Sequence, residues 1–114
     1  GLYILRNLGN DSFAETLQFY DYQPTTTTLT YGISVIDLDN DGIMDVFMTG
    51  TYDTNTNNIR FYKGNSNNTF TLTPIPSLQS INNTLLIVNH QWGDVDNDGD
   101  FDLLISYNAS AATP

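Results

Sequence analysis

The chain has 114 residues, a formal net charge of −10 and only three basic residues. This balance excludes the basic surface that binds nucleic acid or an anionic membrane. The length fits one small domain or part of a larger array. The chain has no cysteine, and no apolar run is long enough to insert into a bilayer.

The predicted elements are short strands separated by turns and polar connections. Apolar runs with β-branched and aromatic members, bounded by Gly, Pro and Asn, indicate strands. No stretch has a convincing helical pattern. In chain order, the predicted strands are residues 2–7, 13–20, 31–36, 43–49, 59–63, 70–73, 84–92 and 101–107.

An internal repeat of 57 residues relates these elements. A shift of 57 aligns Asn10 with Asn67 and Phe13 with Phe70, and it needs no gap. Four short antiparallel strands per period are typical of a β-propeller blade. We therefore expect an all-β fold with about two repeats, as part of a larger propeller or repeat assembly. The predicted division is an outer half-blade at 1–24, a complete blade at 25–80, and the inner half of the next blade at 81–114.

Two acidic loops occupy the same place in the two periods and hold nine of the thirteen acidic residues. Each has Asp at loop positions 1, 3, 5 and 9, and Gly at position 6 (Gly42 and Gly99). Crowded carboxylates repel one another unless a cation lies among them, and Ca²⁺ prefers six to eight oxygen ligands. Position 7 would supply a backbone carbonyl. The predicted ligands of two Ca²⁺ ions are Asp37, Asp39, Asp41, Ile43 (carbonyl) and Asp45, and Asp94, Asp96, Asp98, Asp100 (carbonyl) and Asp102.

Two other interpretations of these loops are less consistent with the residues. An EF-hand needs a bidentate Glu at position 12 and flanking helices, but position 12 is Met48 or Ile105 and strand-like runs follow. A catalytic carboxylate pair for glycoside cleavage would use only two of the acids. Metal ligation explains all of them at once, so we predict no catalytic residues here.

The residues from Trp92 to Ile105, and those from Ile36 to Phe47, carry a family resemblance. They resemble the FG-GAP/VCBS repeat, which forms the calcium-loop blades of integrin alpha-subunit propellers and of many extracellular proteins. The resemblance implies Ca²⁺ at both acidic loops. The first copy departs from the pattern because Ile36 stands where the second has Gly93. Such propellers usually have seven blades, whereas this chain has material for two.

Several other residues are candidates for binding or modification. Four asparagines fit the N-glycosylation pattern, and the first two share one place in the repeat. His90, the only histidine, is interpreted as structural or exposed, and Trp92 as core between blades rather than a sugar-stacking platform. The candidate glycosylation sites are Asn10, Asn67, Asn82 and Asn108.

These observations predict a calcium-binding, secreted or cell-surface scaffold and not an enzyme. Its role would be adhesion, a surface coat or self-assembly, with Ca²⁺ as a structural ion in each blade. Its partners would be further blades, from the same longer chain or from other copies, and a protein or glycan ligand. The alternatives are a lectin-like carbohydrate-binding propeller, or a fragment of a polysaccharide-acting propeller enzyme whose active site lies elsewhere.

Overall fold

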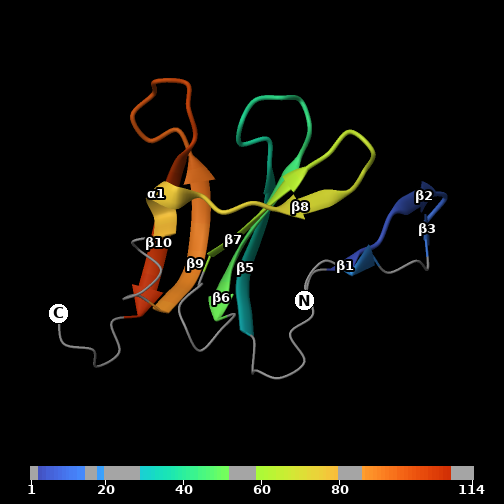
Figure 1. The fold of residues 1–114 in the computed structure, drawn as a ribbon, viewed down its shortest axis with the longest axis horizontal. Coiled ribbons are helices and arrows are strands. Elements are labelled where there is room, and N and C mark those ends of the chain that lie inside the picture. The colour runs from blue at the N-terminus through green and yellow to red at the C-terminus, as the bar shows by residue number, and fades with distance from the viewer. Residues whose placement is uncertain (1–2, 15–17, 20–28, 52–58, 80–85, 109–114) are drawn as a thin grey trace.

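The computed structural model describes residues 3–14, 18–19, 29–51, 59–79 and 86–108 (Figure 1). These residues form antiparallel strands and one short helix, which confirms the all-β prediction. The predicted Pro- and Thr-rich connection at 23–28 and the candidate Asn82 lie outside the described residues. The elements are β1 (Tyr3–Ile4), β2 (Asn7–Gly9), β3 (Ser12–Phe13), β4 (Gln18–Phe19), β5 (Leu29–Ile36), β6 (Asp45–Thr51), β7 (Ile59–Gly64), β8 (Phe70–Leu72), α1 (Pro76–Gln79), β9 (Leu86–Gly93) and β10 (Asp102–Asn108).

The centre of the molecule is a four-stranded antiparallel sheet in the order β5-β6-β7-β8. Strands that are consecutive in the sequence are neighbours in this sheet. The first acidic loop joins β5 to β6, and Ile36 at the end of β5 pairs with Asp45 at the start of β6. Strand β6 begins two residues later than predicted, since the loop continues to its ninth position.

The two faces of this sheet are both apolar at its centre, because side chains alternate along β6 and β7. Val46, Met48 and Tyr62 form a buried cluster on one face, against which Ile4 and Phe70 pack. A second buried cluster contains Phe47, Ile59, Phe61 and Ile87, and so it joins β9 to the sheet.

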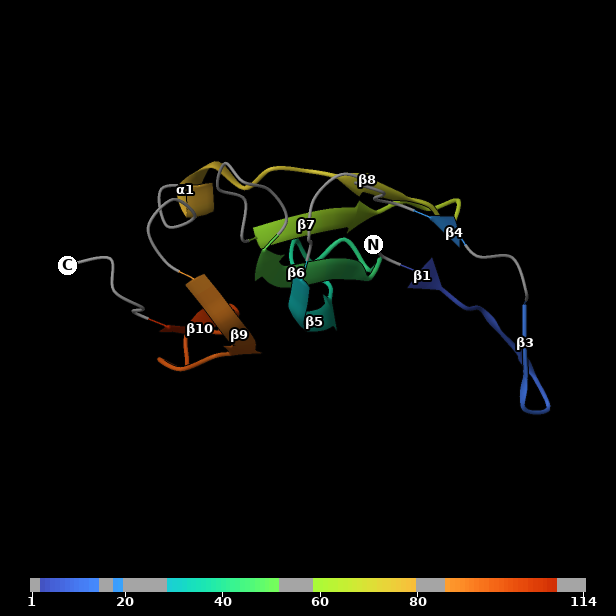
Figure 2. The same cartoon turned by 90° about the horizontal axis from the view of Figure 1, so that it is seen from below.

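Strands β9 and β10 form a separate antiparallel hairpin that lies against this second cluster (Figures 1 and 2). Trp92, Leu103 and Ile105 pack against the cluster from the hairpin. This confirms the interpretation of Trp92 as core. The second acidic loop joins β9 to β10, and both acidic loops project from the same end of their strands (Figure 1).

The N-terminal hairpin differs from the two continuous strands that we predicted. It is divided into two short ladders, β1 with β4 and β2 with β3. The register shifts between Asn7 and Gly9, which interrupts the pairing. The predicted turn is confirmed: Asn10 and Asp11 both have positive φ, of 52° and 60°. Two such residues suit a two-residue hairpin turn, whose twist matches that of the strands.

One short helix, α1, departs from the prediction that no helix forms. Its first residue is Pro76, whose fixed φ suits the first helical position. The amide of Leu78 donates to the carbonyl of Ile75 over 3.0 Å. Ile75 and Leu78 pack against the cluster between the sheet and β9, so this turn is held by burial rather than by helical periodicity.

Candidate metal centre

Asp45 anchors the first acidic loop to the sheet. It is the first residue of β6 and is fully buried. Its Oδ2 accepts a hydrogen bond from the Leu38 amide over 3.0 Å, and its Oδ1 accepts one from the Gly64 amide over 2.8 Å. The carboxylate therefore connects the loop after β5 with the end of β7. The ninth-position Asp thus closes the loop from the start of a strand.

Asp37 shapes the opposite side of the loop through its two carboxylate oxygens. They accept hydrogen bonds from the amides of Asp41 over 3.1 Å and Gly42 over 2.9 Å. The backbone can turn this sharply because Asn40 and Gly42 have positive φ, of 57° and 83°. Gly adopts this conformation without steric cost, which accounts for Gly at position 6.

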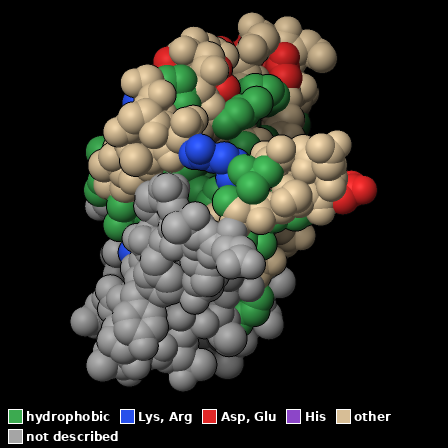
Figure 3. Space-filling model, turned by 90° about the vertical axis from the view of Figure 1, so that its right-hand side faces the viewer, with side chains coloured by type: hydrophobic (Ala, Val, Ile, Leu, Met, Phe, Trp, Pro, Cys, Tyr) green, Lys and Arg blue, Asp and Glu red, His purple; other side chains and the backbone are tan. Residues whose placement is uncertain are grey.

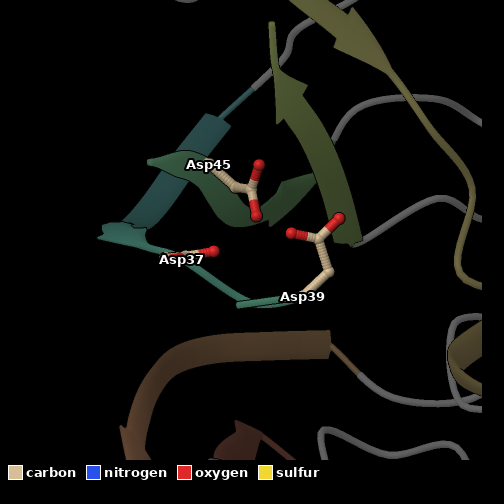
Figure 4. A group of neighbouring side chains, drawn as sticks. All are labelled: Asp37, Asp39 and Asp45. Carbon is tan, nitrogen blue, oxygen red and sulfur yellow. The ribbon is translucent and has the colours of Figure 1, made fainter. Parts of the chain in front are cut away.

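Three carboxylates of the first loop converge. Asp37, Asp39 and Asp45 each offer one oxygen, and these oxygens lie within 4.8 Å of one another. Figure 4 shows the three side chains directed toward a common space enclosed by the loop and the start of β6. A cluster of this size and composition could hold a metal ion.

The second loop repeats this arrangement. Asp94 accepts hydrogen bonds from the amides of Asp98 over 3.0 Å and Gly99 over 2.9 Å, and Gly99 has a φ of 96°. Asp102, the first residue of β10, accepts a hydrogen bond from the Val95 amide over 2.8 Å. The converging oxygens, again within 4.8 Å, belong to Asp94, Asp96 and Asp102.

The structure does not bring the fifth-position carboxylates into these clusters. Oδ1 of Asp41 accepts a hydrogen bond from the Ile43 amide over 2.8 Å, and Asp98 makes the same contact with the Asp100 amide over 2.9 Å. Each loop therefore gathers three of its predicted side-chain ligands. Ligation by Asp41, Asp98 and the carbonyls of Ile43 and Asp100 stays a prediction.

Sequence reasoning missed the cation that contacts the first loop. Lys63 on β7 forms salt bridges with Asp39 and, over 2.8 Å, with Asp41. The hydrogen bonds that the Lys63 amine donates to these two carboxylates raise its pKa, and the bond from Lys63 is the main cause of the lowered pKa of Asp41. A signal for this contact was present, because Lys63 lies 57 residues after Arg6 and so keeps a basic residue at one repeat position.

His90 belongs to a polar network between the sheet and β9. Its Nε2 lies 2.8 Å from Ser34 Oγ and its Nδ1 lies 2.9 Å from Thr49 Oγ1. Trp92 Nε1 donates to the same Ser34 oxygen over 3.1 Å. Burial lowers the pKa of His90, which favours the neutral ring. Because hydroxyls contact both ring nitrogens, the network lacks the carboxylate of a Ser-His-acid triad.

Residues of the N-terminal hairpin, of the β7–β8 turn and of the first acidic loop (Ile43 and Met44) line an open cavity of about 470 Å³. Its lining is mostly apolar, with Arg6 and Asn65 among the polar residues. Figure 3 shows the face on this side of the molecule, with Lys and Arg side chains near its middle and hydrophobic side chains on either side of them. Phe70 is the aromatic residue among the described residues of the lining, so no described Tyr or Trp offers a platform for sugar stacking there.

The described glycosylation candidates lie in different settings. Asn10 and Asn67 are exposed, and both lie in turns that join antiparallel strands. The Asn67 side chain accepts a hydrogen bond from the Thr69 amide over 3.2 Å. Asn108 is the last residue of β10.

Comparison with known families gives one result. The model of the FG-GAP-like repeat matches residues 1–48 and 37–105. The two matches end 57 residues apart, at the same point in each period, which agrees with the internal repeat. Comparison with curated proteins and with solved structures gives no match. Among the described residues, no helix is long and apolar enough to cross a membrane. The two matches together cover most of the chain, and the protein therefore belongs to the FG-GAP-like repeat family.

Proposed function

We propose that the chain is a calcium-stabilised scaffold built from propeller-type blades. The observation that carries this proposal is the duplicated loop geometry. Both loops direct three carboxylates to one point, and both use the same set of backbone hydrogen bonds. A turn that only needed to be soluble would not require the same costly clustering of like charges twice.

The chemistry of the donors favours Ca²⁺ over a transition metal. Each cluster consists of carboxylate oxygens, and neither contains a His or Cys. Hard cations prefer such oxygens, and Ca²⁺ tolerates the irregular, flexible geometry of a loop better than Mg²⁺ does. In the first loop the ion would be held by Asp37, Asp39 and Asp45, and in the second by Asp94, Asp96 and Asp102.

The role proposed for the ion is structural. Asp45 already connects the loop to the end of β7 through the Gly64 amide. An ion bound to this carboxylate would also draw in Asp37 and Asp39 and so fix the β5–β6 connection. None of the clustered carboxylates lines the cavity of about 470 Å³, although Ile43 and Met44 of the first loop border it.

The proposed partners are further blades, from the same longer chain or from other copies. An apolar stripe on β5 supports this proposal, with Tyr31, Ile33 and Val35 exposed by 43%, 58% and 64%. Ile33 and Val35 correspond in the repeat to His90 and Trp92. Those two residues contact Phe47 on the sheet in edge-to-face geometry, with ring centroids 4.9 and 5.0 Å apart. By this correspondence the stripe would pack on a preceding blade, as β9 packs on the sheet before it.

A secreted or cell-surface location, and a role in adhesion, surface coating or self-assembly, form part of the proposal because they are typical of this family. N-glycans at Asn10 and Asn67 would project from exposed turns without disturbing a strand. The lectin-like and enzyme-fragment alternatives have no supporting site in the described residues.

The test of the proposal is calcium-dependent stability. Thermal unfolding of the chain should be measured with excess Ca²⁺ and after chelation. A ligand that binds only the folded state stabilises it by about 2.7 kcal/mol at a hundredfold excess over Kd, so the melting temperature should rise clearly. Asp39→Ala and Asp96→Ala should each remove one site and leave the other. Equal melting temperatures with Ca²⁺ and with chelator would refute the proposal.

A further inference from the structure

The two acidic loops differ in their balance of charge, which the repeat does not predict. The first contains four Asp residues, and the amine of Lys63 lies between the carboxylates of Asp39 and Asp41. The second contains five, because Asp100 stands where the first has Ile43. Among the described residues, no Lys or Arg forms a salt bridge with a carboxylate of the second loop.

The position of Lys63 is fixed by the fold. The next residue, Gly64, donates its amide to Asp45, so the end of β7 is attached to the loop. Gly64 also lies so close to the loop that a Cβ on it would come within 2.2 Å of the Met44 carbonyl oxygen. This close approach places the Lys63 amine beside the loop, where it offsets part of the carboxylate repulsion.

We infer that Lys63 is a built-in competitor of the metal ion, so that the two loops fill in order and the second fills first. This inference rests on the proposed function. To bind a divalent cation, Asp39 must exchange its salt bridge with Lys63 for the ion. An amine that stays nearby repels the ion, and one that leaves gives up two ion pairs. In either case the first loop binds the divalent ion more weakly than a loop without a lysine beside it.

The same contact gives the first loop a second property. Because Lys63 neutralises part of its charge, the first loop keeps its form at low Ca²⁺ better than the second does. The second loop depends more strongly on the ion, since five carboxylates lie in it without a basic partner among the described residues. The chain would thus respond to calcium over a broader range of concentration than two equal sites allow.

Calorimetric titration with Ca²⁺ tests the inference in backgrounds that keep one loop each. Asp96→Ala leaves the first loop, and Asp39→Ala leaves the second. Lys63→Gln should raise the affinity of the first loop roughly tenfold, which corresponds to about 1.4 kcal/mol. It should leave the affinity of the second loop unchanged. Lys63 is half-exposed, so the change should not prevent folding.

Two control variants separate the local contact from net charge. Arg6→Gln removes the basic residue at the equivalent repeat position, which forms no salt bridge with a described carboxylate, and it should not alter either affinity. Lys63→Arg keeps the cation and should keep the weaker binding. In the unmodified chain, titration should show two steps, with the tighter step lost in Asp96→Ala.

The outcomes distinguish the two proposals. Suppose that Ca²⁺ binds in both backgrounds, but Lys63→Gln leaves the affinity of the first loop unchanged or lowers it. This result would overturn the competitor role of Lys63 and leave the proposal of a calcium scaffold intact. The absence of binding in the unmodified chain would overturn both. An equal gain from Arg6→Gln would show that net charge, and not the contact of Lys63, sets the affinity.

Discussion

At the scale of single residues, Gly64 shows how closely the sheet and the first acidic loop fit together. Strand β7 passes the loop so closely that only hydrogen occupies the position of a side chain. A Cβ at Gly64 would lie 2.2 Å from the Met44 carbonyl oxygen and 2.9 Å from Cγ2 of Ile43. The close approach lets the Gly64 amide donate to Asp45. Glycine is thus required at position 64 because there is no room for a side chain, and not because of its backbone conformation.

We predict that Gly64→Ala lowers the free energy of unfolding by about 1–3 kcal/mol, the usual cost of forcing an extra methyl group into a packed site. It should also weaken calcium binding at the first loop, because Asp45 would lose its partner. Gly93→Ala is the matched control, since no atom lies within 4 Å of a Cβ there. Chemical denaturation of both variants measures the difference, and equal stabilities would contradict the packing argument.

His90 carries a pH-dependent contribution to stability. A neutral ring with its proton on Nδ1 satisfies the whole network: Trp92 donates to Ser34, Ser34 donates to Nε2, and Nδ1 donates to Thr49. Protonation of Nε2 would leave the Ser34 hydroxyl proton without its acceptor and bury a charge. This physical picture agrees with the lowered pKa of His90.

The sign of the effect follows from this shift. The folded state binds the His90 proton less readily than the unfolded state does. The contribution of His90 to the free energy of unfolding is therefore fully present above the unfolded pKa near 6.5. Stability is then lost as the pH falls below 6.5 toward the folded pKa. Denaturation midpoints measured between pH 7.5 and 5.5 in excess Ca²⁺ should show this decline. His90→Gln should flatten it; an unchanged slope in that variant would refute the assignment.

At the scale of elements, β6 is the strand on which both faces of the sheet depend. Met48 belongs to one buried cluster and Phe47 to the other. Phe47 is fully buried, and the rings of His90 and Trp92 meet it at interplanar angles of 73° and 84°. Edge-to-face contacts of this kind add to the area that the ring buries. Strand β6 therefore connects the sheet to the following hairpin.

We predict that Phe47→Ala lowers the free energy of unfolding by about 3–5 kcal/mol, as is usual for a buried Phe. That is a large part of the stability of a small domain, so the measurement needs saturating Ca²⁺. Phe101→Ala is the control, because Phe101 is 54% exposed. If both variants lower the free energy of unfolding equally, the packing of β9 and β10 around Phe47 does not stabilise the fold as predicted.

At the scale of the whole molecule, the two faces of the central sheet are covered in different places. The β9–β10 hairpin packs on the face that contains Phe47, and Ile4 packs on the other face near Tyr62 (Figure 2). The part of that second face on β5 carries the exposed stripe of Tyr31, Ile33 and Val35. Exposed apolar stripes of this kind mark sites of association.

We predict that the chain self-associates in solution and that Val35→Lys weakens this association without unfolding the chain. Val35 is 64% exposed, so the introduced charge would be solvated in the monomer. In a complex the same charge would lose water against the apolar surface of the partner. Leu72→Lys is the control, because it changes an exposed apolar residue on the edge strand β8, away from the stripe. Sedimentation velocity over a range of concentrations measures the change. A monomer at every concentration would contradict the prediction.

The sequence by itself determined the fold class, the repeat and most strand positions. It could do so because strand formation and turn chemistry depend on local patterns, such as the apolar run of Val46, Phe47 and Met48 in β6 or the Asn-Asp turn after β2. The acidic loops were predictable for the same reason. Residues 37–45 form a closed local structure whose turns follow from Asn40, Gly42 and carboxylates a few residues away.

Only the tertiary structure decided which distant residues meet these local units. The contact of Lys63 with the first loop joins residues 22 and 24 positions apart, and that of His90 with Ser34 spans 56. Such contacts depend on sheet register and on how one hairpin lies on another. The turn of α1 was also decided by packing, since Ile75 and Leu78 lie against a buried cluster. Local pattern fixes which element forms, whereas the position of each element against the others fixes which charges and rings are partners.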